Sequence, residues 1–478
     1  MKKNLHLNLN PAQLQIILLL LIEIAIIILI SSVLLIKVPK PTTFHNNDKS
    51  SEVDLHLISE LVSKSIASST LQDLKTIIKQ SYQAYSKKCF GSDFISPLTG
   101  ECVNYSGISL TAIDALDTLI LIGDSEGVEQ INNFLQSKNF FCKAKSNDLI
   151  HTKHLISHFI GGLISAYCLT SNKLYIRKAI ECADFSLSAF HGDIPKPLIN
   201  GNTKQSQDYL WAKGTTLSES SSFPVEFNGL SCISKNKKYS FRIKNYFNCI
   251  SKIITSQDEL FLFLSTDTCS NSSDKFGISP LSISFLANTI RYHILSPSNE
   301  TENILNWFER KYESLNLKEI VITNDSLDPR FDSTICQLLP LLRYYNQQKY
   351  SRIIKKLNSK CHFMAEKGLP SISAQIKKKY IEIDQNGFNF ESSLIEDLIV
   401  NGEIQEHDLK RDFINATNNR IRCKNALCKL YSQDPDIIQN FMPSISLSKW
   451  LKFLLFENGG IKYDKFIFNE AGHIIPKC

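Results

Sequence analysis

Three zones of different hydrophobic pattern divide the chain. Residues 16–36 are apolar apart from Glu23 and are long enough to cross a bilayer as a helix. No small-residue cleavage site follows them, which favours a membrane anchor over a signal peptide. Residues 37–75 are polar and rich in serine, as is typical of a stem. From residue 76 to residue 478, helical patterns separated by short polar turns predict one large helical domain or two tightly fused ones.

The most regular helical pattern in this domain runs over residues 109–123. Apolar residues recur there at helical spacing and are interrupted by Asp114 and Asp117, and Gly123 supplies a C-terminal stop. Two carboxylates beside a buried stripe are costly unless they are hydrogen-bonded or functional. The pattern therefore leaves two interpretations open, aspartates that cap neighbouring loops and aspartates that take part in catalysis.

An internal repeat indicates how the helices are connected. Residues 168–175 and 232–239 share the pattern Cys, hydrophobic, Ser or Thr, any, Asn, Lys, any, Tyr. Each copy lies between two helical stretches and so predicts the turn of an antiparallel helix pair. Helix pairs repeated along a chain bury their apolar faces against neighbouring pairs, either in an open solenoid or in a closed toroid. The periodicity itself does not choose between these two.

Charge and cysteine content limit the class of protein. The net charge of +6 is spread along the chain with no basic stripe among aromatic residues, which gives nucleic-acid binding no support. All 13 cysteines follow the apolar segment, and their odd number predicts a free thiol or an intermolecular bond. Cys89 and Cys102 bracket a short loop and are the pair we expect to be bonded. The other pairs cannot be assigned from the sequence.

Lysines do not orient the predicted membrane helix, because they lie on both sides of it. The cysteines and the glycosylation sequons favour an oxidising lumen for the downstream chain, with residues 1–15 as a short cytosolic tail. The sequence therefore predicts a single-pass type II membrane glycoprotein. The sequons are at Asn104, Asn271, Asn299, Asn324 and Asn415.

Several short motifs resemble, in order along the chain, those of glycoside hydrolase family 47. This family comprises the class I α-1,2-mannosidases and relatives that mark misfolded glycoproteins for degradation. The similar words are DALDT within residues 109–123, IGGLISAY at 160–167, LSESSS with VEF at 217–227, and FIFNEA at 466–471. The resemblance covers residues 82–476. It implies an all-α (α/α)7 barrel of antiparallel helix hairpins, here preceded by a transmembrane helix.

The same resemblance implies where catalytic groups should lie. An inverting glycosidase needs a general acid and a base that activates water on the opposite face of the sugar. In the family register, His154 stands at the acid position and Ser393 at the base position, with Glu396 on the neighbouring glutamate. A slipped register would allow Glu391 to act as the base, and a histidine at position 154 can also donate a proton.

Further site residues follow from the family words. Asp332 is retained. The resemblance offers Arg330, two residues before it, together with Glu219 and Glu226 as substrate-binding residues, although Arg330 could instead pair with Asp332. The family also uses a calcium ion held by a C-terminal threonine, and Glu470 is the residue here that the resemblance offers as a ligand. Two more family motifs that contain acidic residues are replaced here by sequences without them, at residues 281–287 and 442–445.

Compared with the family motifs, this chain thus retains the apolar motifs and the turns, whereas charged residues expected in the pocket are replaced. The leading hypothesis is a mannosidase-like glycoprotein of the endoplasmic reticulum or Golgi membrane that recognises high-mannose N-glycans or glycoproteins, with impaired hydrolysis. One alternative is an active calcium-dependent α-1,2-mannosidase with shifted catalytic groups. Another is a structural or redox-linked partner, given the many cysteines. The shifted groups would be Asp332, Glu391, Glu396 and His154.

Overall fold

The computed structural model divides the chain into two compact units, Met1–Glu52 and Val53–Cys478. It describes residues 68–137, 142, 149–312, 330–365, 369–371, 373–376, 381–383, 390, 392–402, 407–423, 427, 429–430 and 438–477, all within the second unit. No helix in these ranges is long and apolar enough to cross a bilayer. The predicted anchor at 16–36 and most of the predicted stem lie outside them. The first helix, α3, begins at Ser68, within the segment predicted as stem.

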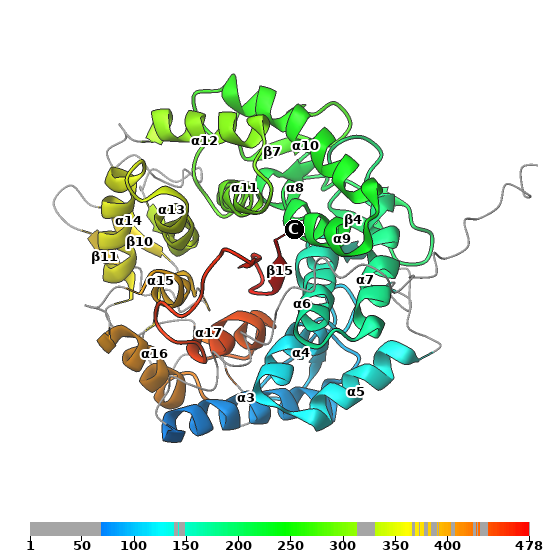
Figure 1. Cartoon of the computed structure of the whole chain (residues 1–478), viewed down its shortest axis with the longest axis vertical. Helices are drawn as coiled ribbons and strands as arrows, with labels where there is room; N and C mark the ends of the chain where they lie inside the picture. The colour runs from blue at the N-terminus through cyan, green and yellow to red at the C-terminus, as the bar shows by residue number, and fades with distance from the viewer. Residues whose placement is uncertain are drawn as a thin grey trace, which may run out of the picture. The chain divides into compact units, whose positions relative to one another are not determined.

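Helices that line the inside of the second unit form a closed ring (Figure 1). Consecutive inner helices pack against each other, and the ring closes where η5 packs on α4. These segments bury most of their side chains, and α4 buries Asp114 and Asp117 with its apolar residues. They are α4 (Leu110–Ile122), η1 (His154–Ile160) continued by α6 (Gly161–Thr170), α9 (Pro224–Ser234), α11 (Ile283–Leu295), α13 (Leu338–Asn346), α15 (Ser393–Asn401) and η5 (Ser446–Leu451) continued by α17 (Lys452–Leu454).

A second set of helices alternates with the first along the chain and lies outside the ring (Figure 1). These outer helices are amphipathic, and α10 for example buries one stripe that includes Tyr239, Ile243, Phe247 and Ile254. The outer helices are α3 (Ser68–Cys89), α5 (Ser125–Gln136), α7 (Lys173–Ser186), α10 (Lys237–Thr255), α12 (Asn299–Tyr312), α14 (Ser351–Met364) and α16 (His407–Asn419). The prediction of a helical barrel is confirmed for the described residues.

The two copies of the internal repeat form the same helix–helix turn. In each, a non-glycine residue with positive φ ends an inner helix, Ser171 at 55° and Lys235 at 56°. The next residue, Asn172 or Asn236, caps the following outer helix by accepting a hydrogen bond from a backbone N–H two residues on. The shared sequence thus encodes a reversal of the chain.

A C-terminal hairpin occupies the inside of the ring (Figure 1). Strands β14 (Phe466–Phe468) and β15 (Ile474–Pro476) pair antiparallel, and β15 packs on α6 and α9. The paired glycines of α6 permit this packing, because a Cβ on Gly161 would lie 2.6 Å from Asn469 and one on Gly162 would lie 2.9 Å from the backbone of α4. The two glycines of the IGGLISAY motif are therefore required for close packing.

Short strands, which the helical patterns did not predict, precede several inner helices. Strands of two to four residues are too short to show a periodic pattern in the sequence. The three-stranded sheets join β3 (Leu149–His151), β4 (Leu198–Asn200) and β5 (Ser206–Gln207); β6 (Thr215–Thr216), β7 (Phe263–Ser265) and β8 (Ser270–Asn271); and β9 (Arg330–Asp332), β10 (Ser373–Ile376) and β11 (Ile381–Ile383). The two-stranded sheets are β1 (Phe94–Ile95) with β2 (Cys102–Val103), and β12 (Lys429–Leu430) with β13 (Ile438–Gln439). Short helical turns α8 (Leu217–Ser220), η2 (Leu187–Ala189) and η3 (Ser333–Gln337) complete the connections.

Disulfide bonds join neighbouring elements of the barrel. Cys89 and Cys102, the pair expected from the short loop between them, are bonded. Cys168 is free and buried, whereas the other described cysteines are bonded. The further pairs include Cys142–Cys182, Cys249–Cys269 and Cys336–Cys361, and Cys232 and Cys423 are also bonded.

Candidate functional site

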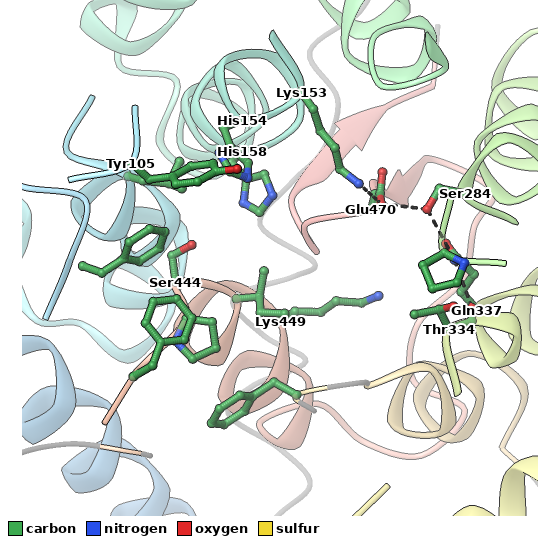
Figure 2. Close-up of a pocket in the computed structure, with 17 residues that line it drawn as sticks. Tyr105, Lys153, His154, His158, Ser284, Thr334, Gln337, Ser444, Lys449 and Glu470 are labelled. Atoms are coloured by element: carbon green, nitrogen blue, oxygen red, sulfur yellow. Dashed lines mark hydrogen bonds and ion pairs between the residues drawn. The ribbon is translucent and has the colours of Figure 1, made fainter. Parts of the chain in front are cut away.

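A cavity of about 490 Å³ opens where the inner helices begin. His154 starts η1, Leu110 starts α4, and Ser284 lies in the first turn of α11, so several helix N-termini converge on it. Figure 2 shows the side chains that line the cavity and labels the polar ones, Tyr105 among them. The lining residues are Phe94, Tyr105, Leu110, Lys153, His154, His158, Pro280, Ser284, Thr334, Gln337, Phe390, Phe441, Pro443, Ser444, Ile445, Lys449 and Glu470.

Two of the wall segments, η1 and η5, are π-helical and both pack on α4. π-Helical turns are rare and are frequent at functional sites. Segment η1 presents His154 and His158 to the cavity, and η5 presents Lys449. The local backbone therefore departs from regular α-helix at the two places that supply His154, His158 and Lys449 to the cavity.

His158 is oriented by the first aspartate of the opening helix. Its Nδ1 lies 2.9 Å from Asp114 Oδ2, so Nε2 is the nitrogen left to face the cavity. The buried imidazole of His473 lies 2.9 Å from Asp114 Oδ1 and 2.9 Å from Asp117 Oδ2. Burial opposes ionisation of Asp114, but the two histidines outweigh it and hold its pKa well below the usual range. The aspartates are therefore ionised partners of histidines and are not loop caps.

Asp117 lies deeper than Asp114. Its Oδ2 also accepts hydrogen bonds from Lys452 Nζ at 2.7 Å and Ser165 Oγ at 2.7 Å. Burial raises the pKa of Asp117, yet Lys452 and His473 together lower it to about 2. This carboxylate is fully buried and its hydrogen-bond partners are all within the protein, so its role is to stabilise the barrel.

His154, at the position of the family acid, lines the cavity between aromatic rings. Its ring centroid lies 5.4 Å from that of Tyr105 and 5.5 Å from that of His151, and its Nδ1 is buried without a hydrogen-bond partner. Burial, followed by the neighbouring histidines, lowers the pKa of His154 well below its ordinary value. At neutral pH it is uncharged and is a poor replacement for a carboxylic acid.

Glu470 is the only carboxylate among the described residues that line the cavity. Its Oε1 lies 2.6 Å from Lys153 Nζ and accepts a hydrogen bond of 2.9 Å from Ser284 Oγ. Its Oε2 accepts a bond of 3.3 Å from Asn288 Nδ2. Burial would raise the pKa of Glu470, but Lys153 is the main cause that lowers it to about 2. Figure 2 shows Lys153 reaching across to Glu470.

Within the part of the base segment that the structure describes, no carboxylate lines the cavity. Glu396 is completely buried beneath the cavity, where its Oε1 accepts a 2.7 Å hydrogen bond from Tyr463 and its Oε2 lies 3.5 Å from Lys449 Nζ. Ser393 is also buried. Glu391, the alternative base, lies outside the described residues.

Asp332 caps the turn that follows β9. Its Oδ1 accepts hydrogen bonds from the backbone N–H of Thr334 at 2.8 Å and from its hydroxyl at 2.5 Å, and burial raises its pKa. Thr334, not Asp332, lines the cavity. Arg330 belongs to β9, opposite Gln375 of β10.

The two glutamates assigned to substrate binding lie beside the cavity without lining it. Glu219 accepts a 3.3 Å hydrogen bond from Tyr209, and burial raises its pKa. Glu226 is buried and accepts a 2.8 Å hydrogen bond from Asn469 Nδ2. Burial is the main cause that raises the pKa of Glu226 to about 7.

Among the described residues, no three His, Cys, Asp or Glu side chains are arranged to hold a metal ion. Of the sequon asparagines, Asn104, Asn299 and Asn415 are exposed and Asn271 is half-buried. Asn324 lies outside the described residues.

Comparisons with known proteins establish the family. The profile of glycosyl hydrolase family 47 matches residues 77–362. This chain belongs to that family. It is similar to an α-1,2-mannosidase from Trichoderma reesei, with a TM-score of 0.75 and 17% identity over 87% of this chain and 100% of that one. At this identity the likeness concerns the fold.

Curated relatives are mannosyl-oligosaccharide 1,2-α-mannosidases. The Caenorhabditis elegans protein mans-2 is 25% identical over 240 residues, 48% of this chain and 40% of that protein. The human endoplasmic reticulum enzyme is 28% identical over 40% of this chain and 27% of its own length. The Drosophila melanogaster mannosidase IA is 22% identical over 85% and 67%. The matches with the worm and human proteins thus span less than half of those relatives.

The sequence alone did not identify four residues that take part in this site, namely Lys153, Lys449, Asn288 and His473. Lysines scattered along a chain are usually solvated, and nothing in the local pattern distinguished these two. One available signal was position, because Lys153 immediately precedes the histidine that stands at the acid position.

Proposed function

We propose that this chain is a glycan-recognising member of family 47 whose hydrolytic activity is impaired. The observation that supports this is the charge of the cavity. Among its described lining residues, the one carboxylate, Glu470, is held by Lys153 at 2.6 Å, while a neutral histidine occupies the position of the acid. Inverting hydrolysis needs two carboxyl groups free to exchange protons with the leaving oxygen and with water.

The proposed ligand is a high-mannose N-glycan, by analogy with the relatives named mannosyl-oligosaccharide 1,2-α-mannosidase. A cavity that combines hydroxyl, amide and charged groups with the rings of Tyr105 and Phe441 is suited to a sugar, which offers both hydroxyls and apolar C–H faces. The name of the human relative, the apolar segment 16–36 and the exposed sequons support a type II membrane glycoprotein of the endoplasmic reticulum or Golgi.

A direct test compares binding with turnover for the purified full-length chain. A labelled Man9 oligosaccharide is incubated with it at 1 mM Ca²⁺ or with EDTA, and both retained ligand and released mannose are measured. The expected result is saturable binding without Man8 product, under conditions in which the Trichoderma reesei enzyme releases mannose. Release of mannose by this chain would contradict the proposal, as would absence of glycan binding.

A second candidate function is retained hydrolysis with relocated groups. The observation that favours it is the Asp114–His158 pair, because a carboxylate that orients an imidazole is a common arrangement for proton transfer. Mannose release that disappears in the His158→Gln variant would support this candidate.

A further inference from the structure

The surroundings of Glu470 bear on the metal that the family resemblance implies. Calcium takes six to eight oxygen ligands at about 2.3–2.6 Å. Here both carboxylate oxygens of Glu470 already accept hydrogen bonds, Oε1 from Lys153 and Ser284 and Oε2 from Asn288. A calcium ion on Oε1 would therefore lie close to the ammonium group that is 2.6 Å from the same atom.

Charge opposes the ion as well. The lysine and carboxylate side chains that line the cavity within the described residues are Lys153, Lys449 and Glu470, and Lys449 lies 3.5 Å from the buried Glu396. A doubly charged cation at Glu470 would lie beside the Lys153 ammonium group, which is unfavourable in a partly buried site. The residues present do not fit a calcium ion.

The Lys153–Glu470 pair links several elements of the barrel. Lys153 precedes η1, Glu470 lies in the turn of the β14–β15 hairpin, and Ser284 and Asn288 belong to α11. The Lys153–Glu470 pair thus joins the central hairpin to two walls of the cavity. Figure 2 shows the pair and Ser284 facing the same space.

The pair also suits the recognition of a sugar. An ammonium group has three N–H donors, and Glu470 requires one of them, which leaves donors for ligand hydroxyls. Glu470 can accept a hydrogen bond from the same hydroxyls, so the pair offers a neighbouring donor and acceptor to a vicinal diol. Charged partners make such hydrogen bonds stronger than neutral ones.

We propose that the Lys153 ammonium group, paired with Glu470, takes the place of the family's calcium ion, so that sugar hydroxyls bind in this cavity without a metal. The sugar-binding part rests on the proposed function, whereas the absence of a calcium requirement can be tested separately.

The metal part is tested first, on the full-length chain without glycan. Equilibrium dialysis with radioactive calcium and thermal unfolding with EDTA or 1 mM Ca²⁺ are measured. The expected result is no stoichiometric calcium binding specific to the cavity and the same Tm in both conditions. Stoichiometric binding that is lost in Glu470→Gln, or a Tm raised by calcium, would overturn the proposal whatever the chain does with glycans.

The binding part uses the labelled Man9 oligosaccharide with EDTA. Wild type and Lys153→Arg are expected to bind it, and Lys153→Met to bind about tenfold or more weakly, the effect of losing a charge-assisted hydrogen bond. Lys178→Met is the matched control, because Lys178 pairs with Glu181 on an outer helix. Equal binding by Lys153→Met, or binding that requires calcium, would overturn the proposal.

The variants also separate the two proposals. If no glycan binds in either condition, the proposed function fails, and the dialysis and Tm measurements still decide the metal question. If Lys153→Met does not fold, Lys153→Arg decides the binding part, because an arginine retains the charge and should keep metal-independent affinity.

Discussion

At the scale of single residues, the barrel keeps several ionisable groups away from water, and each is tuned by its contacts. Glu226 on α9 illustrates this, since it is buried and accepts a hydrogen bond from Asn469. Burial raises its pKa from 4.5 to about 7, and Glu470 acts in the same direction, while Asn469 and Arg291 act against it. The folded chain therefore holds a proton on Glu226 that the unfolded chain releases.

This difference predicts a pH-dependent stability. Between pH 4.5 and about 7, folding binds one proton through Glu226, so its contribution is present at low pH and is lost as pH rises. Glu226→Gln should gain about 3 kcal/mol in free energy of unfolding relative to wild type between pH 4.5 and pH 8. Urea unfolding at several pH values measures this, with Glu129→Gln, at an exposed position of α5, as the control. A constant difference between Glu226→Gln and wild type would contradict the assignment.

At the scale of elements, the repeated turns explain why one short word was readable in the sequence. Asn172 and Asn236 each accept a hydrogen bond from a backbone N–H of the following outer helix, and each follows a residue with positive φ. All the contacts that form this turn are between residues close together in the chain, so the turn can be predicted from the local sequence. The register between neighbouring helices depends on distant contacts, such as that of Gly162 with Ile113, which no local pattern contains.

The two caps can be compared directly. Asn172→Ala and Asn236→Ala should each lower the free energy of unfolding by about 1 kcal/mol, the usual effect of removing a cap. Asn133→Ala is a matched control, because Asn133 is exposed within α5 and alanine is favourable in a helix interior. Chemical denaturation measures all three, and equal effects at capping and interior positions would refute the assignment of these turns.

At the scale of the whole molecule, the ring and its central hairpin are joined by buried charge. His473 of the hairpin contacts both aspartates of α4. The motifs shared with the family predicted the barrel because their glycines, helix caps and apolar residues specify how the helices pack. They did not predict what replaced the missing carboxylates, since Lys153 and Lys449 acquire their roles only when elements far apart in sequence meet around the cavity.

Removing His473 should therefore destabilise the entire second unit. His473→Gln leaves part of the charge of Asp114 and Asp117 without compensation, which typically costs about 3–5 kcal/mol. Thermal unfolding should show a lower Tm in a single transition. His191→Gln, at an exposed position, should leave the Tm unchanged. An effect as small as that of His191→Gln would mean that Lys452 and His158 suffice to hold the aspartates.

The central hairpin also has a consequence for synthesis in the cell. Asp117 is made early, yet its partner His473 follows 356 residues later. The face of α4 that packs on η5 and the face of α6 that packs on β15 therefore stay uncovered until the last part of the chain is made, and exposed apolar surface favours aggregation. A chain truncated before residue 473 lacks this partner, and we expect it to be less soluble than the full-length chain.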